Sequence, residues 1–247
     1  MNTICFADAA AHVRLERAAT RHVPADVSVV IAAKQEAPSI GGVIDRTRCY
    51  AGTIHVVVGH STDGTADIAA ANGARVLADG GRGKGEALRR AIPYIEAPVT
   101  VFLDADGSHD PEDIPLLVAP IVAGEADHVA ASRLRGGSSE LHGGFDEFLR
   151  LAGSSFITAC INWRFGCQLS DSQNGFRAVR TSVLRQLALR ENTTTIEQEM
   201  TIRTLRGGWR MTEVPSHEHR RAHGVSHIRV LRDAPRYGYS LVKNLFF

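Results

Sequence analysis

The stretch VTVFLDADGSHDPE, residues 99–112, joins an apolar, β-rich run to two carboxylates one residue apart. The run predicts a buried strand that ends on a site, because Asp104 and Asp106 come directly at its end. Side chains alternate between the faces of a strand, so both carboxylates point to the same side where the chain leaves the sheet. Ligands of open α/β sheets bind at that edge. Carboxylate oxygens there suit Mg2+ or Mn2+, which proteins hold through few carboxylates and substrate phosphates.

A plainer explanation of the same residues is a loop of turn-forming aspartates that caps the helix after Pro111. An isolated Asp-x-Asp pair fits both interpretations equally well. The pattern of the surrounding chain has to decide between them.

Composition predicts a globular protein. The 247 residues are 44% hydrophobic and 22% charged, enough apolar mass for one large domain or two small ones. A formal net charge of +1 gives no global electrostatic reason to expect nucleic acid as a partner. The four cysteines lack paired short spacings, which argues against a disulfide framework and a zinc ribbon and favours a reducing cytoplasm. We expect no membrane span and no signal peptide, because neither pattern occurs in the sequence.

Short apolar strands alternate with helices in the first half of the chain. The β-branched run Val27–Ala33 predicts a strand buried on both faces. Further strands are expected at Ile54–Val58, Ala74–Leu77 and from Val99, separated by helices that begin near Ser39, Asp63 and Glu86. This alternation predicts an α/β fold with a Rossmann-like, mostly parallel sheet and helices on both of its faces.

The second half continues with longer helices and a basic tail. In order, we expect a helix over 111–123, a strand over 128–131, a glycine-rich loop over 135–144, a helix over 145–165, a strand after the polar turn 171–177, helices over 182–189 and 196–206, and a strand over 210–214. Residues 1–24 are expected to form an N-terminal extension with a short helix, and residues 25–247 a single domain.

Seven motifs occur in an order that carries a family resemblance. They are Glu36 after the first strand, Ser61-Thr62-Asp63-Gly64-Thr65, Gly83-Lys84-Gly85-Glu86-Ala87-Leu88, Asp104-Ala105-Asp106, Ala131-Ser132-Arg133, Gly175-Phe176-Arg177 and Arg221-Ala222-His223-Gly224-Val225-Ser226. With them, residues 27–240 resemble family 2 inverting glycosyltransferases of the GT-A fold, and most closely the polyprenyl-phosphate (dolichyl-phosphate) hexosyltransferases. The resemblance implies an enzyme, a transferase that uses a nucleotide-sugar donor.

The resemblance implies that Asp104 and Asp106 bind a Mg2+ or Mn2+ ion, assisted by Ser108, and are catalytic together with Arg221. Such an ion offsets the charge that develops on the departing diphosphate. The resemblance also implies a donor site made of Ala32, Lys34, Glu36, Val58, Lys84, Asp104, Ala105 and Asp106. The alternatives are a solvated first-turn glutamate for Glu36 and, for Lys84, an exposed lysine beside a helix start, since its turn lacks the Walker spacing.

The acceptor-binding residues implied by the resemblance are Arg133, Arg150, Ser154, Arg221 and Ser226. Arg150 and Ser154 are four residues apart, so one helix face presents a guanidinium and a hydroxyl together. The forked donors of arginine suit a phosphate. A surface arginine on an amphipathic helix is the alternative for Arg150, and the resemblance decides against it.

The chain departs from the family pattern in two places that recognise the nucleobase. Residues 32–36 read Ala-Ala-Lys-Gln-Glu instead of the common Pro-Ala-Tyr-Asn-Glu, and Val58 and Gly59 stand where the family commonly has one or two aspartates. An altered donor nucleotide, looser recognition of the base and a weakened enzyme all remain open. We expect weak discrimination between bases, because a pocket rejects analogues mainly by leaving its own polar groups unpaired.

Four histidines near the C-terminus, at 217, 219, 223 and 227, fit no zinc spacing, and the arginines around them oppose a cation. We expect no zinc site. One of these histidines is nevertheless available to complete the shell of an ion held by Asp104 and Asp106.

The function expected from the resemblance is inverting transfer of a hexose from a nucleotide-diphosphate sugar to a polyprenyl phosphate. A phosphate nucleophile is already ionised near neutral pH, so alignment and stabilisation of the leaving group carry the catalysis without a strong base. Two alternatives stay open. One is transfer to a soluble sugar or natural-product alcohol, which needs a base such as Glu197, Glu199 or Asp171, and the other is a degenerate member that only binds nucleotide sugars.

The tail Val225–Phe247 mixes apolar side chains with Arg229, Arg232, Arg236 and Lys243, as an interfacial amphipathic segment does. This pattern predicts a cytoplasmic protein with peripheral contact at the inner face of a membrane, where a polyprenyl phosphate lies. The alternative is a C-terminal helix that packs on the domain and leaves its basic residues in solvent.

Overall fold

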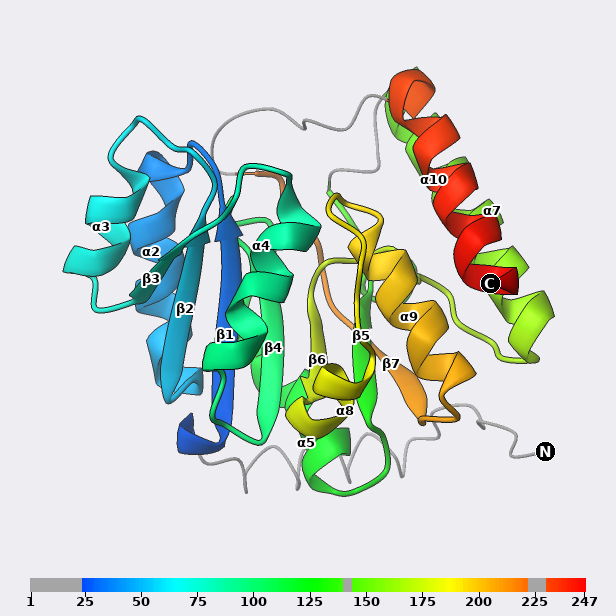
Figure 1. Ribbon diagram of the computed structural model, residues 1–247, viewed down its shortest axis with the longest axis horizontal. Helices are drawn as coiled ribbons and strands as arrows, with labels where there is room; N and C mark the ends of the chain where they lie inside the picture. The colour runs from blue at the N-terminus through cyan, green and yellow to red at the C-terminus, as the bar shows by residue number, and fades with distance from the viewer. Residues whose placement is uncertain (1–23, 140–143, 222–229) are drawn as a thin grey trace.

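A seven-stranded sheet with helices on both faces forms the centre of the molecule (Figure 1). The computed structural model describes residues 24–139, 144–221 and 230–247. The predicted N-terminal extension up to residue 23, Ser226 and the first part of the predicted amphipathic tail lie outside the described residues.

The sheet has the strand order β3-β2-β1-β4-β6-β5-β7. Its strands are β1 (Val27–Ala33), β2 (Thr53–Val58), β3 (Arg75–Ala78), β4 (Val99–Asp104), β5 (His128–Ser132), β6 (Arg177–Arg180) and β7 (Met211–Pro215). Neighbouring strands pair in parallel except at β6, which runs antiparallel to both β4 and β5. The predicted mostly parallel sheet is confirmed, and β1 has the predicted bounds and is buried at all but one position.

The helices that flank the sheet largely follow the predicted pattern. They are α2 (Ala37–Thr47), α3 (Thr65–Ala71), α4 (Lys84–Ala91), α5 (Ile114–Val122), α6 (Arg133–Gly136), α7 (Phe145–Phe165), α8 (Thr181–Gln186), α9 (Ile196–Arg206) and α10 (Val230–Phe246). Both α7 and α9 have the predicted bounds. The N-cap of α2 is Glu36 rather than the predicted Ser39, because Pro38 fits the first turn of a helix, where its missing N–H costs nothing.

Apolar side chains pack on both faces of the sheet. Neighbouring residues of a strand face opposite sides, so β1 contributes Ile31 to one core and Val30 to the other. The core around Ile31 includes Ile40 of α2. The core around Val30 includes Leu88 of α4 and Met200 of α9. The strands are thereby held between two helical layers, and the carboxyl ends of the parallel strands lie at one edge.

The C-terminal helix α10 packs along α7 and against α9 (Figure 1). Leu241 and Leu245 of α10 are buried in a third apolar cluster with Ile161 of α7 and Ile202 of α9. The outer side of the same helix leaves Phe246 exposed. The tail is therefore a helix packed on the fold, as in the alternative interpretation, with apolar residues on its outer side as well. Among the described residues, no helix combines the length and the apolar character needed to cross a bilayer.

Candidate functional site

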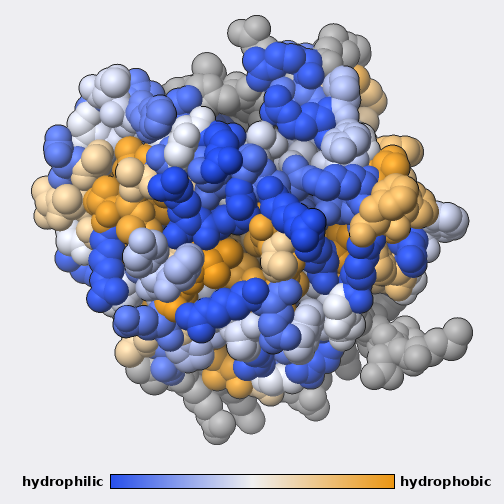
Figure 2. Space-filling view, in the orientation of Figure 1, coloured by the Kyte–Doolittle hydropathy of each residue, from blue (hydrophilic) through white to orange (hydrophobic). Residues whose placement is uncertain are grey.

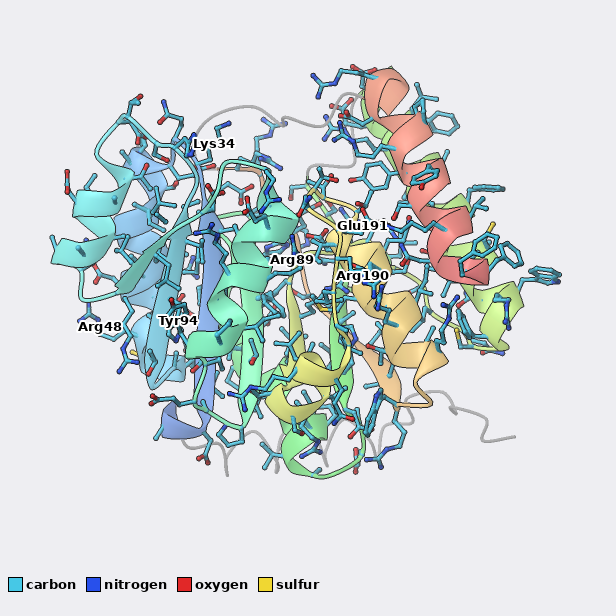
Figure 3. All side chains as sticks on the ribbon, viewed as in Figure 1. Lys34, Arg48, Arg89, Tyr94, Arg190 and Glu191 are labelled. Atoms are coloured by element: carbon cyan, nitrogen blue, oxygen red, sulfur yellow. The ribbon has the colours of Figure 1, made fainter. Side chains whose placement is uncertain are left out.

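A cavity of about 590 Å³ opens at the carboxyl edge of the sheet, where β1, β2, β3 and β4 end. Its lining includes the predicted site residues Ala32, Lys34, Glu36, Lys84, Asp104, Ala105, Asp106 and Arg221. They come together because parallel strands present their carboxyl ends along one edge. Figure 3 shows Lys34 at this edge, just beyond the end of β1. We refer to this space as the edge cavity.

Lys84, which lines the edge cavity, forms ion pairs with two carboxylates. Its Nζ lies 2.5 Å from Asp104 Oδ1 and 2.7 Å from Glu197 Oε1. Burial lowers the pKa of Lys84, but Asp104 and Glu197 outweigh burial and raise the pKa above its usual value. Burial likewise raises the pKa of Asp104, and Lys84 with other positive charges outweighs it and brings the pKa to about 2. Both side chains are therefore charged at neutral pH.

Glycines flank Lys84 because the backbone of this turn packs closely against the backbone of residues 191–193. A Cβ at Gly85 would lie 2.5 Å from the carbonyl oxygen of Glu191, and a Cβ at Gly83 would lie 2.8 Å from that of Asn192. Gly83 also has φ of 122°, a conformation that side chains disfavour. The glycines let the start of α4 approach the loop before α9, and this approach brings Lys84 to Glu197.

Asp106 is buried and held from two sides. Its Oδ1 accepts a hydrogen bond of 3.0 Å from the backbone N–H of Ser108, and its Oδ2 lies 3.0 Å from Arg221 Nη1. The backbone N–H of His219 donates to the carbonyl oxygen of Ser108 at 2.8 Å. The segment that carries Arg221 is thereby tied to the turn after β4, and two residues predicted to be catalytic are in direct contact.

The donor set at the end of β4 suits a divalent cation that takes further ligands from a bound molecule. Asp104 and Asp106 supply hard carboxylate oxygens at one strand end. Within the described ranges, no group of three or more acidic, histidine or cysteine side chains surrounds a metal position. Mg2+ and Mn2+ fit such a pair when water and phosphate oxygens complete the shell. Ser108 positions Asp106 through its backbone, and its predicted place among the ligands stays a prediction.

The structure places Val58 in the apolar core, whereas the sequence predicts it in the donor site. Val58 belongs to the same core as Ile31. The preceding residue, Val57, lines the edge cavity instead. The reason is the alternation of a strand, in which adjacent residues face opposite sides.

A second cavity, of about 310 Å³, lies between α7 and α10. Three predicted acceptor residues, Arg133, Arg150 and Ser154, line it. Much of the remaining lining is apolar, and includes Leu149, Phe156, Ile157 and Leu241. We refer to this space as the α7–α10 cavity.

The two arginines of the α7–α10 cavity differ in their partners. Arg133 is paired through Nε with Asp171 Oδ2 at 2.7 Å and lies 3.5 Å from Glu218 Oε1. Burial lowers the pKa of Arg133, but Asp171 and Glu218 outweigh burial and raise it. The Nε of Arg150, in contrast, is buried and has no hydrogen-bond partner within the part of the chain that the structure describes. Arg150 is therefore the cation better placed to receive an anion.

The three predicted base candidates occupy different environments. Glu199 accepts the backbone N–H groups of Arg190 and Glu191 and pairs with Arg203, so it fastens a loop. Asp171 forms an ion pair with Arg133. Glu197 lies beside Lys84, and its Oε2 is buried with no hydrogen-bond partner among the described side chains and backbone groups. Of these three carboxylates, Glu197 is the one with an oxygen that lacks a hydrogen-bond partner among the described residues.

Several residues of the edge cavity were not predicted. These are chiefly Val57, His60, Asp79, Gly81, Thr194 and Arg232. The chain order held one signal for Asp79, which follows the predicted third strand and so had to lie at the same sheet edge as Asp104. Thr194 and Arg232 reach the cavity only through the packing of distant segments.

The chain matches a family model and resembles known proteins over most of its length. A model of "Glycosyl transferase family 2" matches residues 28–188. A dolichyl-phosphate hexose transferase of Haloferax volcanii is 30% identical over 220 residues, which cover 88% of this chain and 93% of that protein. Glycosyltransferase AglJ of the same organism is 30% identical over 196 residues, 78% of this chain, and the matched region spans 63% of its length.

Solved structures with a similar fold cover nearly the whole chain. Glucosyl-3-phosphoglycerate synthase from Mycobacterium tuberculosis, in complex with Mn2+, UDP and phosphoglyceric acid, superposes with a TM-score of 0.71 at 25% identity. The match covers 94% of this chain and 82% of that one. Its complex with Mn2+, UDP-glucose and phosphoglyceric acid gives a TM-score of 0.72 over the same shares of the two chains.

Proposed function

The chain belongs to glycosyl transferase family 2, and we propose that it transfers a hexose from a nucleotide-diphosphate sugar to the phosphate of a polyprenyl carrier. It is a glycosyltransferase with the GT-A fold. In the proposed reaction a phosphate oxygen of the acceptor attacks the anomeric carbon, the bond from that carbon to the donor diphosphate breaks, and the nucleoside diphosphate leaves with inversion. The similarity to a dolichyl-phosphate hexose transferase over most of both chains supports this acceptor class.

The donor half of the proposal rests on the charges of the edge cavity. Lys84 and Arg221 are cations beside Asp104 and Asp106, and cations aimed at a departing diphosphate stabilise the charge that develops on it. A bound Mg2+ or Mn2+, held by Asp104 and Asp106, would supply further positive charge at the same oxygens. The other residues of the cavity bind and orient the nucleotide.

One observation carries the acceptor half: the α7–α10 cavity is mostly apolar, and the guanidinium of Arg150 lines it with no partner for its buried Nε among the described residues. An arginine fork binds a phosphate in a defined orientation, and apolar walls suit a hydrocarbon chain. A free sugar phosphate would gain little from such walls. Arg133 and Ser154 add a second guanidinium and a hydroxyl at the same place.

The outer surface of α7 and α10 supports delivery of the acceptor from a membrane. We define the α7–α10 face by the exposed residues Phe148, Phe156, Trp163, Tyr239, Val242, Phe246 and Phe247. Figure 2 shows hydrophobic residues on the side where Figure 1 draws these helices, as well as on the opposite side and near the centre. Aromatic side chains are favoured at the boundary between lipid and water, and Phe156 belongs both to this face and to the cavity lining. We infer peripheral contact with a bilayer through this face.

The position of Glu197 favours a second candidate function, transfer to a soluble alcohol. Its buried Oε2 lacks a hydrogen-bond partner in the described part of the chain, and it adjoins Lys84 in the edge cavity. A hydroxyl nucleophile needs a base, and Glu197 is the carboxylate placed to serve. The similar structures of glucosyl-3-phosphoglycerate synthase hold phosphoglyceric acid, a soluble molecule.

A comparison of acceptors distinguishes transfer to a polyprenyl phosphate from transfer to a soluble alcohol. The protein, Mn2+ and UDP-, GDP- or dTDP-hexoses are incubated with either a short polyprenyl phosphate or a panel of soluble alcohols and phosphoglyceric acid. We expect sugar on the lipid phosphate and a Glu197→Gln variant that keeps most of that activity. Transfer to a soluble acceptor only, abolished by Glu197→Gln, would replace the lipid proposal with the second candidate.

A further inference from the structure

The edge cavity extends over three strands beyond β4. Asp104 ends β4, and the strands that follow across the sheet are β1, β2 and β3. Adjacent strands lie about 4.8 Å apart, so the end of β3 is roughly 14 Å from the end of β4. Under the proposed function the diphosphate lies at Asp104 and Asp106, and the nucleoside therefore extends toward β2 and β3. Gly59 and Asp79 line that far part of the cavity.

Asp79 is held in place at the end of β3 with one oxygen left over. Its backbone N–H donates to the carbonyl oxygen of Val58 at 3.1 Å, and its Oδ1 accepts from the backbone N–H of Gly81 at 2.8 Å. No hydrogen bond to Oδ2 comes from any described residue. The side chain is half-buried, so a ligand in the cavity can reach this oxygen.

The carboxylate of Asp79 fills the space that a side chain at position 59 would occupy. A Cβ at Gly59 would lie 2.7 Å from Asp79 Oδ2, closer than real contacts allow. The family resemblance leads one to expect an aspartate at the end of β2. In this chain the residue there is Gly59, which is buried, and the carboxylate of Asp79 from the neighbouring strand lies next to it. The missing carboxylate is replaced from β3, and only a glycine at 59 leaves room for it.

We propose that Asp79 Oδ2 recognises the nucleobase of the donor. It would select the bases that carry a ring N–H on their Watson–Crick edge, which are uracil, thymine and guanine. This inference rests on the proposed function, because it takes the edge cavity to hold a nucleotide. An ionised carboxylate only accepts hydrogen bonds. In cytosine and adenine the ring nitrogen on that edge carries a lone pair in place of the hydrogen, so a carboxylate opposite this nitrogen is repelled by it. Only the exocyclic amino group remains as a donor to the carboxylate, and we expect these bases to bind less tightly.

The test is calorimetric titration of the full chain with UDP, GDP, CDP and ADP in the presence of Mn2+ and without acceptor. We expect UDP or GDP to bind at least about tenfold more tightly than CDP and ADP, as for one hydrogen bond to a charged group. Asp79→Asn keeps an oxygen for the Gly81 N–H but turns an amide NH2 toward the base. We expect it to lower the ratio of UDP to CDP affinity about tenfold.

Two further variants make the test specific. Asp45→Asn removes an exposed carboxylate on α2, far from the edge cavity and paired with Arg48, and should leave all four affinities unchanged. Gly59→Ala displaces the Asp79 carboxylate without touching it chemically, and should lower base selectivity as Asp79→Asn does. This second variant also decides the matter if Asp79→Asn does not fold.

The outcomes separate this inference from the proposed function. Nucleotide binding with an unchanged UDP to CDP ratio in Asp79→Asn and Gly59→Ala would overturn the role of Asp79 and leave the donor cavity standing. A wild-type protein that binds none of the four nucleotides would overturn the donor cavity and the role of Asp79 together.

Discussion

Asp106 is held by the Ser108 backbone on one oxygen and by Arg221 on the other. Asp106→Asn keeps its shape and the contact with Ser108 while removing the charge. We expect the variant to lose at least about a hundredfold in turnover, the usual cost of removing one charge-stabilising group, with an unchanged thermal unfolding midpoint to within a few degrees. Steady-state transfer assays with Mn2+ and calorimetric unfolding measure both quantities.

Asp110→Asn is the matched control for this change. Asp110 lies in the turn after the same strand, where it pairs with Arg46 and caps a short helical turn, and it does not line the edge cavity. It should keep nearly full turnover. Undiminished turnover of Asp106→Asn, or of the wild type in excess EDTA, contradicts a metal-assisted reaction.

His55 makes the stability of the fold depend on pH. It is buried in β2, and neither ring nitrogen has a hydrogen-bond partner in the described structure. Burial lowers the pKa of His55, and the charge of Arg75 lowers it further. The unfolded chain binds a proton near pH 6.5 and the folded chain does not, so the free energy of unfolding falls as the pH drops below about 6.5. Burial lowers the pKa of His128 in the same direction.

Replacing His55 removes part of that dependence. We expect His55→Leu to raise the free energy of unfolding by about 1 kcal/mol at pH 6, because it removes two unpaired buried nitrogens, and to flatten the slope between pH 7.5 and 5.5. Urea titrations at three pH values measure the slope. An unchanged slope in His55→Leu would mean that His55 takes up its proton in the folded state.

Helix α7 carries both Arg150 and much of the apolar wall of the α7–α10 cavity, so its two ends should respond differently to the same substitution. We expect Arg150→Leu to raise the KM for a short polyprenyl phosphate about tenfold or more, since a charged hydrogen bond to phosphate is lost, while UDP affinity is unchanged. Arg164→Leu, on an exposed part of the same helix, serves as the control. Equal KM values for the two variants would remove Arg150 from the acceptor site.

Long, strongly patterned elements could be predicted from the sequence, and contacts between distant elements could not. β1, α7 and α9 have the predicted bounds because their apolar periodicity is uninterrupted. The antiparallel direction of β6 depends on how the chain returns to the sheet, which no local pattern encodes. The same limit applies to the site: the end of β4 was predicted, whereas Val57 replaced Val58 at the cavity because only the assembled sheet fixes which side faces it.

The charge of the whole chain is +1, so overall attraction cannot bring the molecule to an anionic membrane, and the α7–α10 face would have to do so. We expect the protein to cosediment with anionic vesicles at low salt. Replacing Trp163 and Phe247, which are 79% and 90% exposed, by Ser should lower the partition coefficient at least about fivefold, roughly 1 kcal/mol. Truncation of α10 is a poorer test, because Leu241 and Leu245 are buried.

Tyr94 supplies the control for the vesicle experiment. It is an exposed aromatic residue at the end of the short 3-10 turn Ile92–Tyr94 that follows α4, and Figure 3 shows it on the opposite side of the molecule from α7 and α10. Tyr94→Ser should bind vesicles as the wild type does. If the wild type stays in the supernatant and no sugar reaches a lipid phosphate, the acceptor is soluble and Glu197 becomes the residue to study.

Lys84 acts as a tethered counter-ion, and this affects the order in which ligands enter. Its ammonium lies on Asp104 and the guanidinium of Arg221 lies on Asp106, so free Mn2+ has to compete with cations that cannot diffuse away. A nucleoside diphosphate gives both cations another anion to pair with and frees the carboxylates. We therefore expect Mn2+ alone to bind weakly and Mn2+ to bind at least about tenfold more tightly in saturating UDP, a coupling of roughly 1.4 kcal/mol that must be reciprocal. Each ligand then lowers the dissociation constant of the other by the same factor, so the metal and the nucleotide occupy the cavity together more often than either does alone.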